Sequence, residues 1–131
     1  AEAFAGNARS AAAVDLDLDG DIDLVVNSFR QPPRVLINQQ ASKNNFVQLR
    51  LSTAKGKNPR ALGATIQLTA NGKPLLRQVS GGPGSLSQAE ALSAAGLGRA
   101  ATVDVVIKWP GGTEGKHPGL VANKRHAIAQ P

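Results

Sequence analysis

The sequence predicts an all-β protein in which a calcium-binding β-hairpin is followed by a small antiparallel β-sandwich. Three observations indicate this fold class. Beyond residue 45, apolar residues alternate with polar ones in three segments, which is the period of a half-buried strand. Asn71-Gly72 follows one of these segments, and both positions accept the positive φ of a tight hairpin turn. Short apolar runs flank a loop at 15–23 that has an acidic residue at every second position.

The acidic loop has the spacing of a calcium site. Five carboxylates repel one another at neutral pH, and a hard cation with six to eight oxygen ligands is the simplest way to stabilise them. Gly20 at the sixth position permits the sharp turn of such a loop. We expect Asp21 to bind through its backbone carbonyl and the other four residues through their carboxylates. The predicted Ca²⁺ ligands are Asp15, Asp17, Asp19, Asp21 and Asp23.

The residues around the loop distinguish it from an EF-hand. An EF-hand requires a Glu at position 12 and a helix on each side, whereas position 12 here is Val26. The flanking runs, residues 11–14 and 24–27, are short and partly β-branched, so we predict strand, loop and strand. The alternative is a solvated acidic turn that binds nothing.

The polar stretch from Gln39 to Asn45 predicts a boundary near residue 42, between a hairpin unit at 1–42 and a β domain at 43–131. In the first unit, Pro32-Pro33 is expected to end the second strand, and residues 34–38 are expected to form a third. In the second unit we predict strands at 47–52, 64–70, 75–80 and 102–109, and a short one near 127–128. Residues 88–95 are Ala-rich and predict one or two helical turns, and Gly96-Leu97-Gly98 predicts a break.

The alternation in this second unit also predicts its core. In each strand the apolar positions are expected to face inward, and the polar positions between them to face solvent. The predicted core residues are Val47, Leu49, Ile66, Leu68, Val103, Val105 and Ile107. Trp109 ends an alternating strand and is expected to be a core or capping aromatic, with a sugar-binding platform as the alternative.

Charge is distributed unevenly along the chain. The 131 residues carry a net charge of +6, but residues 1–40 have a net of −3 and residues 41–131 have twelve Lys or Arg against three acidic residues, a net of +9. A basic surface favours a polyanionic glycan or an anionic surface as partner, and solubility alone is the alternative. Lys55, Lys57 and Arg60 share one short loop and are the best candidates for such contacts. No nucleic-acid motif and no apolar run of about 20 residues occurs.

Two family resemblances follow from the motifs. Residues 12–38, with the acidic loop and a following Pro-Arg-Val-Leu-Ile-Asn, resemble one FG-GAP/VCBS repeat, a blade unit of calcium-binding β-propellers. Residues 45–130 resemble the ASPIC/UnbV domain, which typically follows such repeats at the C-terminal end of secreted proteins. The resembling segments of this domain are residues 58–64, 77–82, 86–88, 96–98 and 107–112. The resemblance implies the fold and the calcium site rather than a reaction.

No catalytic constellation is predicted. His117 and His126 lack a zinc-ligand spacing and are expected on the surface, and the chain has no Cys. The serines around residues 80–87 lie in a glycine-rich loop without the nucleophile-elbow pattern. We therefore predict a non-enzymatic, calcium-stabilised module for adhesion or assembly, extracellular or periplasmic, whose partner is a protein or the rest of a longer polypeptide. An accessory structural subunit of a larger complex is the alternative.

Overall fold

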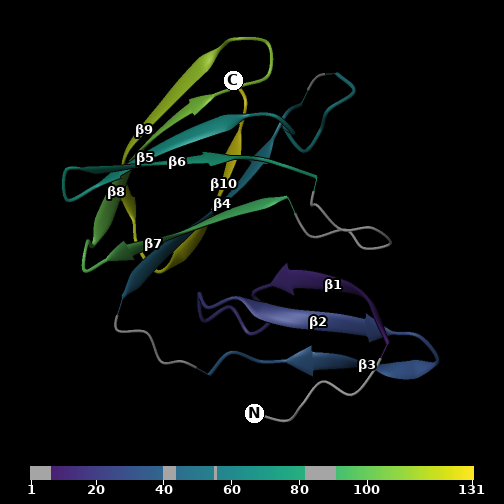
Figure 1. Ribbon diagram of the computed structural model, residues 1–131. Helices are drawn as coiled ribbons and strands as arrows, with labels where there is room; N and C mark the ends of the chain where they lie inside the picture. The colour runs from purple at the N-terminus through teal and green to yellow at the C-terminus, as the bar shows by residue number, and fades with distance from the viewer. Residues whose placement is uncertain (1–6, 40–43, 55, 82–90) are drawn as a thin grey trace. The chain divides into compact units, whose positions relative to one another are not determined.

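The computed structural model describes residues 7–39, 44–54, 56–81 and 91–131, and these residues are all-β (Figure 1). They form ten strands and no helix, which confirms the predicted fold class. It follows that no helix in the described ranges is long and apolar enough to cross a membrane. The strands belong to two compact units, one with the first three strands and the other with the remaining seven. The predicted boundary at residue 42 lies outside the described residues.

The first unit is a three-stranded antiparallel sheet (Figure 1). Its strands are β1 (Ala8–Val14), β2 (Asp23–Ser28) and β3 (Gln31–Leu36), in the order β1-β2-β3. The β1–β2 pair runs in register from Ala11 opposite Val26 to Val14 opposite Asp23. The acidic loop therefore joins the two strands of an antiparallel hairpin, as its flanking residues predict.

Pro32 and Pro33 do not end the second strand as predicted. The second strand ends at Ser28, and the chain turns at Phe29 and Arg30, where Arg30 adopts a φ of 55°. Both prolines lie inside β3, which begins three residues before the predicted third strand. A proline is compatible with β3 because this strand is an edge of the sheet and has a ladder on one side only.

The second unit consists of two sheets. One has three strands in the order β10-β4-β7, and the other has four in the order β6-β5-β8-β9. The bounds are β4 (Asn45–Ser52), β5 (Thr65–Ala70), β6 (Lys73–Gln78), β7 (Leu92–Gly98), β8 (Thr102–Lys108), β9 (Glu114–Val121) and β10 (Lys124–Ala129). Buried residues of both sheets belong to one hydrophobic cluster, so the sheets pack face to face.

The core of the second unit is the one that alternation predicts. All seven predicted core residues are at most 2% exposed. Trp109, directly after β8, is 3% exposed and belongs to the same cluster, so it is a core aromatic. One polar position departs from the pattern, because Gln48 is buried and accepts a hydrogen bond from Arg125 Nε at 3.0 Å. Burial of Gln48 is possible because its amide has this partner.

The β5–β6 hairpin also confirms its sequence signal. Ala70 pairs with Lys73, which leaves Asn71 and Gly72 as a two-residue loop. Their φ values are 50° and 72°, and a turn with two positive φ values matches the right-handed twist of the strands.

The predicted helical turns at 88–95 are wrong for the described part of that range. Residues 92–98 form β7, which pairs with β4, and Ser93, Ala95 and Leu97 are buried. Alanine favours helices, but intrinsic propensity is a small effect, and here it is overridden because this segment forms a ladder with β4 and buries every second residue. Gly96-Leu97-Gly98, predicted as a break, is the end of this strand.

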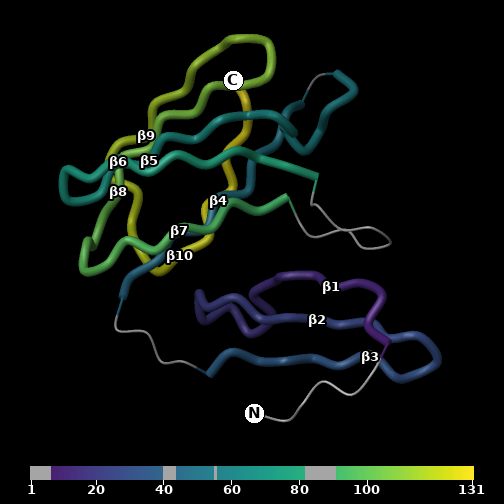
Figure 2. Tube along the Cα trace, viewed as in Figure 1, coloured from purple at the N-terminus to yellow at the C-terminus, as the bar shows by residue number. Residues whose placement is uncertain are grey.

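The C-terminal part holds two strands where the sequence predicts one. Strand β9 contains Gly115, Pro118 and Gly119, which are typical loop residues. It can contain them because it is an edge strand, with a register shift opposite Val103–Val105. Figure 2 traces the chain from β9 in one sheet to β10 in the other. Strand β10 pairs with β4 in parallel, so the predicted sandwich is not wholly antiparallel. A parallel pair is possible here because the long path between β4 and β10 runs through the second sheet.

The side chain of Asn58 helps to fix the loop before β5. The Asn58 amide donates to Leu62 O at 2.8 Å and accepts from Leu62 N at 2.9 Å. This arrangement places Ala61 and Ala64 in the core, both fully buried. The segment 58–64, one of those that carry the family resemblance, therefore has a structural role.

Candidate metal site

The acidic loop is held in shape by its own carboxylates. Asp15 Oδ2 accepts a hydrogen bond from Gly20 N at 3.0 Å, and Asp19 Oδ1 accepts one from Asp21 N at 2.8 Å. Leu18 and Gly20 have positive φ values of 64° and 97°. Glycine adopts such a conformation without strain, so Gly20 has the role in the turn that the sequence predicts for it. The loop thereby turns its carboxylates toward a common centre.

Three of the five predicted ligands lie together. One carboxylate oxygen each of Asp15, Asp17 and Asp19 lies within 4.8 Å of the others. Two ligands on one Ca²⁺, each at 2.3–2.6 Å, are at most about 4.6–5.2 Å apart. The spacing of these three oxygens therefore fits a single Ca²⁺. Asp15 is buried, while Asp17 and Asp19 are exposed, so the site opens to solvent on one side.

Asp23 has a different environment from the other acidic residues. It is completely buried, and its two oxygens accept hydrogen bonds from Leu16 N at 2.7 Å and Asn38 N at 2.8 Å. Each carboxylate oxygen has a second lone pair, so these bonds are compatible with metal ligation. Asp23 thus connects the start of the loop to the chain beyond β3. Asp21 lies in the loop and is half-buried, and its metal role, like that of Asp23, stays a prediction.

The electrostatics of the loop favour a cation. Desolvation raises the pKa of Asp17 above the ordinary value of 3.8. The hydrogen bond from the Asp19 backbone lowers the pKa, while the negative charges of Asp19, Asp23 and Asp15 raise it. A bound cation would reverse the effect of these negative charges. The cluster therefore has negative charge and three oxygen donors of the type that a hard divalent ion binds.

The two histidines are expected on the surface, and in the structure each of them is partly exposed. Both lie in strands and are half-buried, His117 in β9 and His126 in β10. His126 Nε2 is 2.8 Å from Val121 O. Among the described residues, the one group of metal-ligand type contains neither histidine.

The basic loop candidates are only partly described. Lys57 and Arg60 are exposed, and Lys55 lies outside the described residues, as do Ser85 and Ser87. Sequence reasoning missed a second basic feature in the first unit. The guanidinium groups of Arg9 and Arg30 lie 5.3 and 5.1 Å from the centre of the Phe29 ring. The pairing of Ala8 with Ser28 brings Arg9 to this turn, and the sequence gives no signal for that register shift.

The fold and site define an all-β protein with an acidic hairpin and a two-sheet β domain. The chain belongs to the ASPIC and UnbV family, because the model of that family matches residues 54–131, more than half of its length. This confirms the resemblance of the second unit. The match does not extend to the acidic hairpin.

Curated relatives match a larger part of the chain. Cartilage acidic protein 1 of Xenopus tropicalis and of Mus musculus are each 30% identical to it over 110 residues, 82% of this chain. The protein of the same name from Homo sapiens is 29% identical over 110 residues. The chain spans only 16–17% of the length of these relatives. It therefore corresponds to a small part of each of them.

Proposed function

We propose that this chain is a non-enzymatic, calcium-stabilised module of an extracellular protein, and that it acts in adhesion or assembly. Its first unit would be a single FG-GAP/VCBS-like blade, and its second an ASPIC/UnbV domain. The observation that carries the proposal is the convergence of Asp15, Asp17 and Asp19 in a turn held by its own hydrogen bonds. Ca²⁺ would be structural, because it cancels the repulsion that otherwise opposes closure of the loop.

The expected affinity suits an extracellular site. Extracellular calcium modules bind at about 10⁻⁴–10⁻³ M, and the solvent-exposed side of this loop is typical of such weak sites. The name of the relatives refers to cartilage, which supports an extracellular location for this chain too. Among the described residues no acid–base pair or nucleophile arrangement suggests a reaction. The partner we expect is another protein, or the rest of a longer polypeptide.

Calcium titration tests the proposal. Ca²⁺ at tenfold excess over Kd should stabilise the folded chain by about 1.4 kcal/mol if the unfolded chain binds none. The rise in Tm should be lost in Asp17→Asn and in Asp19→Asn, and it should remain in Glu114→Gln, an exposed carboxylate of the second unit. Hydrogen exchange then locates the effect. Calcium should slow exchange in β1, β2 and β3 and leave β4–β10 unchanged.

Two results would contradict the proposal. One is a Tm that does not change with Ca²⁺ or chelator, together with no metal in elemental analysis of the protein. The other is stabilisation that persists in both Asp variants, because the ion would then bind elsewhere. Mg²⁺ serves as the comparison ion, since it demands a tighter octahedral set of ligands and should bind more weakly here.

A second candidate function, an accessory structural subunit, is favoured by the first unit's sheet. Leu24 and Leu36 are paired across β2 and β3 and are 42% and 44% exposed. The next pair has Val35, 54% exposed, and its side chains lie on the opposite face because side chains alternate along a strand. A sheet with apolar side chains on both faces is typical of one that is covered on both sides. A blade between neighbouring blades, or a subunit within a complex, would bury them.

A further inference from the structure

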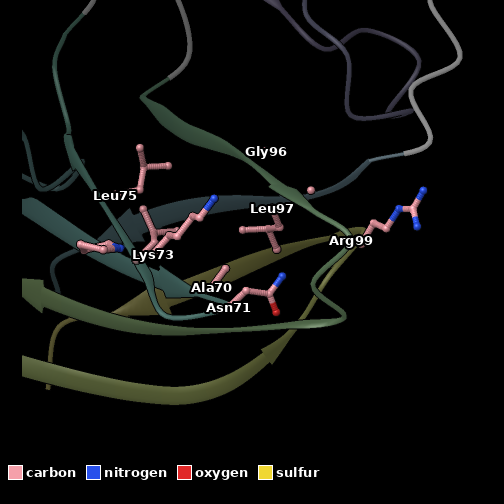
Figure 3. Close-up of a pocket in the computed structure, with 10 residues that line it drawn as sticks. Ala70, Asn71, Lys73, Leu75, Gly96, Leu97 and Arg99 are labelled. Carbon is pink, nitrogen blue, oxygen red and sulfur yellow. The ribbon is translucent and has the colours of Figure 1, made fainter.

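A pocket of about 440 Å³ lies within the second unit, between the β5–β6 hairpin and the end of β7 (Figure 3). Its size is within the range of small-molecule sites, about 300–1,000 Å³. Its lining comes from two segments, residues 68–75 of the hairpin and residues 96–99 at the end of β7. Strands β6 and β7 are edge strands of different sheets, so the pocket lies at an open side of the two-sheet stack.

The inner part of the pocket is aliphatic. Leu68 and Leu97 are core residues, 2% and 7% exposed, and Leu75 and Ala70 pack against the same core. Figure 3 shows Leu97 of β7 beside Ala70 and Asn71 of the hairpin. None of the described residues that line the pocket is aromatic. A flat sugar ring would therefore find no stacking surface, whereas an alkyl chain would contact the core leucines directly.

The local backbone keeps the pocket open. Gly96 and Gly98 lie on either side of Leu97, so this end of β7 has a single side chain in three residues. Asn45 pairs with Gly98 and Phe46 with Gly96, an irregularity that leaves Leu97 without a directly opposed residue in β4. Further along the same two edge strands, Arg77 Nε of β6 donates to Ala94 O of β7 at 3.4 Å. The edges are thus bridged at one end and separate at the other.

The polar groups of the pocket are all hydrogen-bond donors or neutral. Lys73 supplies an ammonium group and Asn71 an amide, and no Asp or Glu is among the described residues that line the pocket. Arg99 is also part of the lining, but Figure 3 shows its side chain directed away from Leu97 and Asn71. Lys73 is therefore the cation that an anionic group in the pocket would meet first. The pocket combines an apolar interior with a positively charged rim.

We propose that this pocket binds a small amphiphilic carboxylate, with its aliphatic chain against Leu68 and Leu97 and its carboxylate beside Lys73 and Asn71. The aliphatic lining selects the chain, and the positive charge of Lys73 disfavours an ammonium head group and favours a carboxylate. This inference goes beyond the proposed function, since it assigns a ligand to the ASPIC/UnbV domain and does not depend on the acidic hairpin.

Octanoate is a suitable probe, because it has the required head and chain and is soluble. ¹H–¹⁵N NMR titration of the full chain with octanoate should give saturable shifts in residues 70–75 and 96–99, with a Kd of roughly millimolar order for so small a ligand. Propionate, which has the head alone, should bind at least tenfold more weakly. Octyltrimethylammonium, which has the chain with the opposite charge, should also bind more weakly.

Two substitutions separate the two halves of the site. Lys73→Gln should weaken octanoate about two- to fivefold, the range of an exposed ion pair. The matched control is Lys116→Gln, which removes an exposed charge from β9 and should leave the affinity unchanged. Ala70→Leu replaces a methyl group in the pocket lining with an isobutyl group and should abolish the saturable shifts. An unchanged Tm would show that the variant is folded.

Each of the other outcomes would overturn the proposal. Equal binding of octyltrimethylammonium and octanoate would remove the role of Lys73. Equal binding of propionate would show that the apolar interior is not used. Shifts that survive in folded Ala70→Leu, or that appear only outside the two lining segments, would place the octanoate elsewhere. Absence of any saturable shift would eliminate the site, and it would leave the calcium proposal untouched.

Discussion

Two aspartates of the acidic loop have different physical roles. Asp23 is completely buried and accepts two backbone hydrogen bonds, so it stabilises the loop whether or not an ion is present. Asp17 is exposed and belongs to the cluster of possible metal ligands. Removing Asp23 leaves two backbone N–H groups without their acceptor, a cost of about 1–3 kcal/mol for each one that stays buried. Removing Asp17 has no such cost.

The raised pKa of Asp17 predicts a pH dependence of the metal-free protein. A carboxyl whose pKa is higher in the folded state holds its proton more tightly there, so its contribution to stability is present at low pH. That contribution is lost as the pH rises from the ordinary value of 3.8 through the raised value. In chelator, Asp17→Asn should remove this loss of stability. The Tm of the variant should therefore rise relative to that of the wild type as the pH increases above 4.

Thermal melts in chelator across this pH range test the prediction, with Glu114→Gln as the control for loss of a carboxyl. Added Ca²⁺ should reverse the trend, because protons compete with the ion for Asp17 and the wild type should then be stabilised toward neutral pH. Parallel pH curves of wild type and Asp17→Asn in chelator would show that Asp17 does not titrate as proposed.

The sequence predicts part of this site from spacing alone. Alternating carboxylates with Gly20 at the sixth position are enough to predict that Asp15, Asp17 and Asp19 converge, because all three lie in one short turn. The hydrogen bond from Asn38 to Asp23 spans fifteen residues and depends on how β3 returns beside β2. The position of Pro32-Pro33 suggested a different turn, so this contact could not be predicted.

At the scale of elements, the alternation of apolar and polar residues predicts a strand correctly where one face of the strand is buried and the other is exposed. Strands β5 and β8 have this pattern and were predicted with their core residues. Strand β7 is rich in small residues. The preference of its alanines for a helix is overridden by pairing with β4. Strand β9 contains Gly and Pro at positions that only an edge strand tolerates, and its edge position is set by the whole sheet.

The register of β5 predicts opposite outcomes for two adjacent residues. Ile66 is fully buried and pairs with Ile107 in β8, while Gln67 is exposed. Ile66→Asp places a carboxylate in the core at a cost of several kcal/mol, a large fraction of the 5–15 kcal/mol of a typical domain. We expect this variant to unfold the second unit. Gln67→Asp should cost less than about 1 kcal/mol.

Urea denaturation followed by Trp109 fluorescence measures both variants, because this residue is the chain's single tryptophan and is buried in the same core. Ile66→Val is the control for loss of volume without charge, and it should cost about 0.5–1.5 kcal/mol. Similar midpoints for Ile66→Asp and Gln67→Asp would show that the register of β5 is wrong.

At the scale of the whole molecule, the two units differ in charge as well as in fold. Five aspartates lie within residues 15–23, in the loop after β1 and at the first residue of β2, while residues 41–131 have a net charge of +9. One Ca²⁺ would bring residues 1–40 from −3 close to neutrality and leave the second unit as the charged one. A polyanionic glycan would then be attracted to the second unit with little repulsion from the first.

We predict salt-sensitive binding of the calcium-loaded chain to a polyanion, with the exposed Lys57 and Arg60 as contributors. A heparin-type column tests this. The double variant Lys57→Ser/Arg60→Ser should elute at lower salt than the wild type, because exposed charges act only within about 8–10 Å at physiological salt and two neighbours on one loop act together. The control is Lys116→Ser/Lys124→Ser, which loses the same charge from two separate strands.

If the two double variants elute together, net charge alone governs retention. If none is retained at low salt, the basic composition serves solubility, and the interpretation of the chain as a subunit with a fixed protein partner gains support.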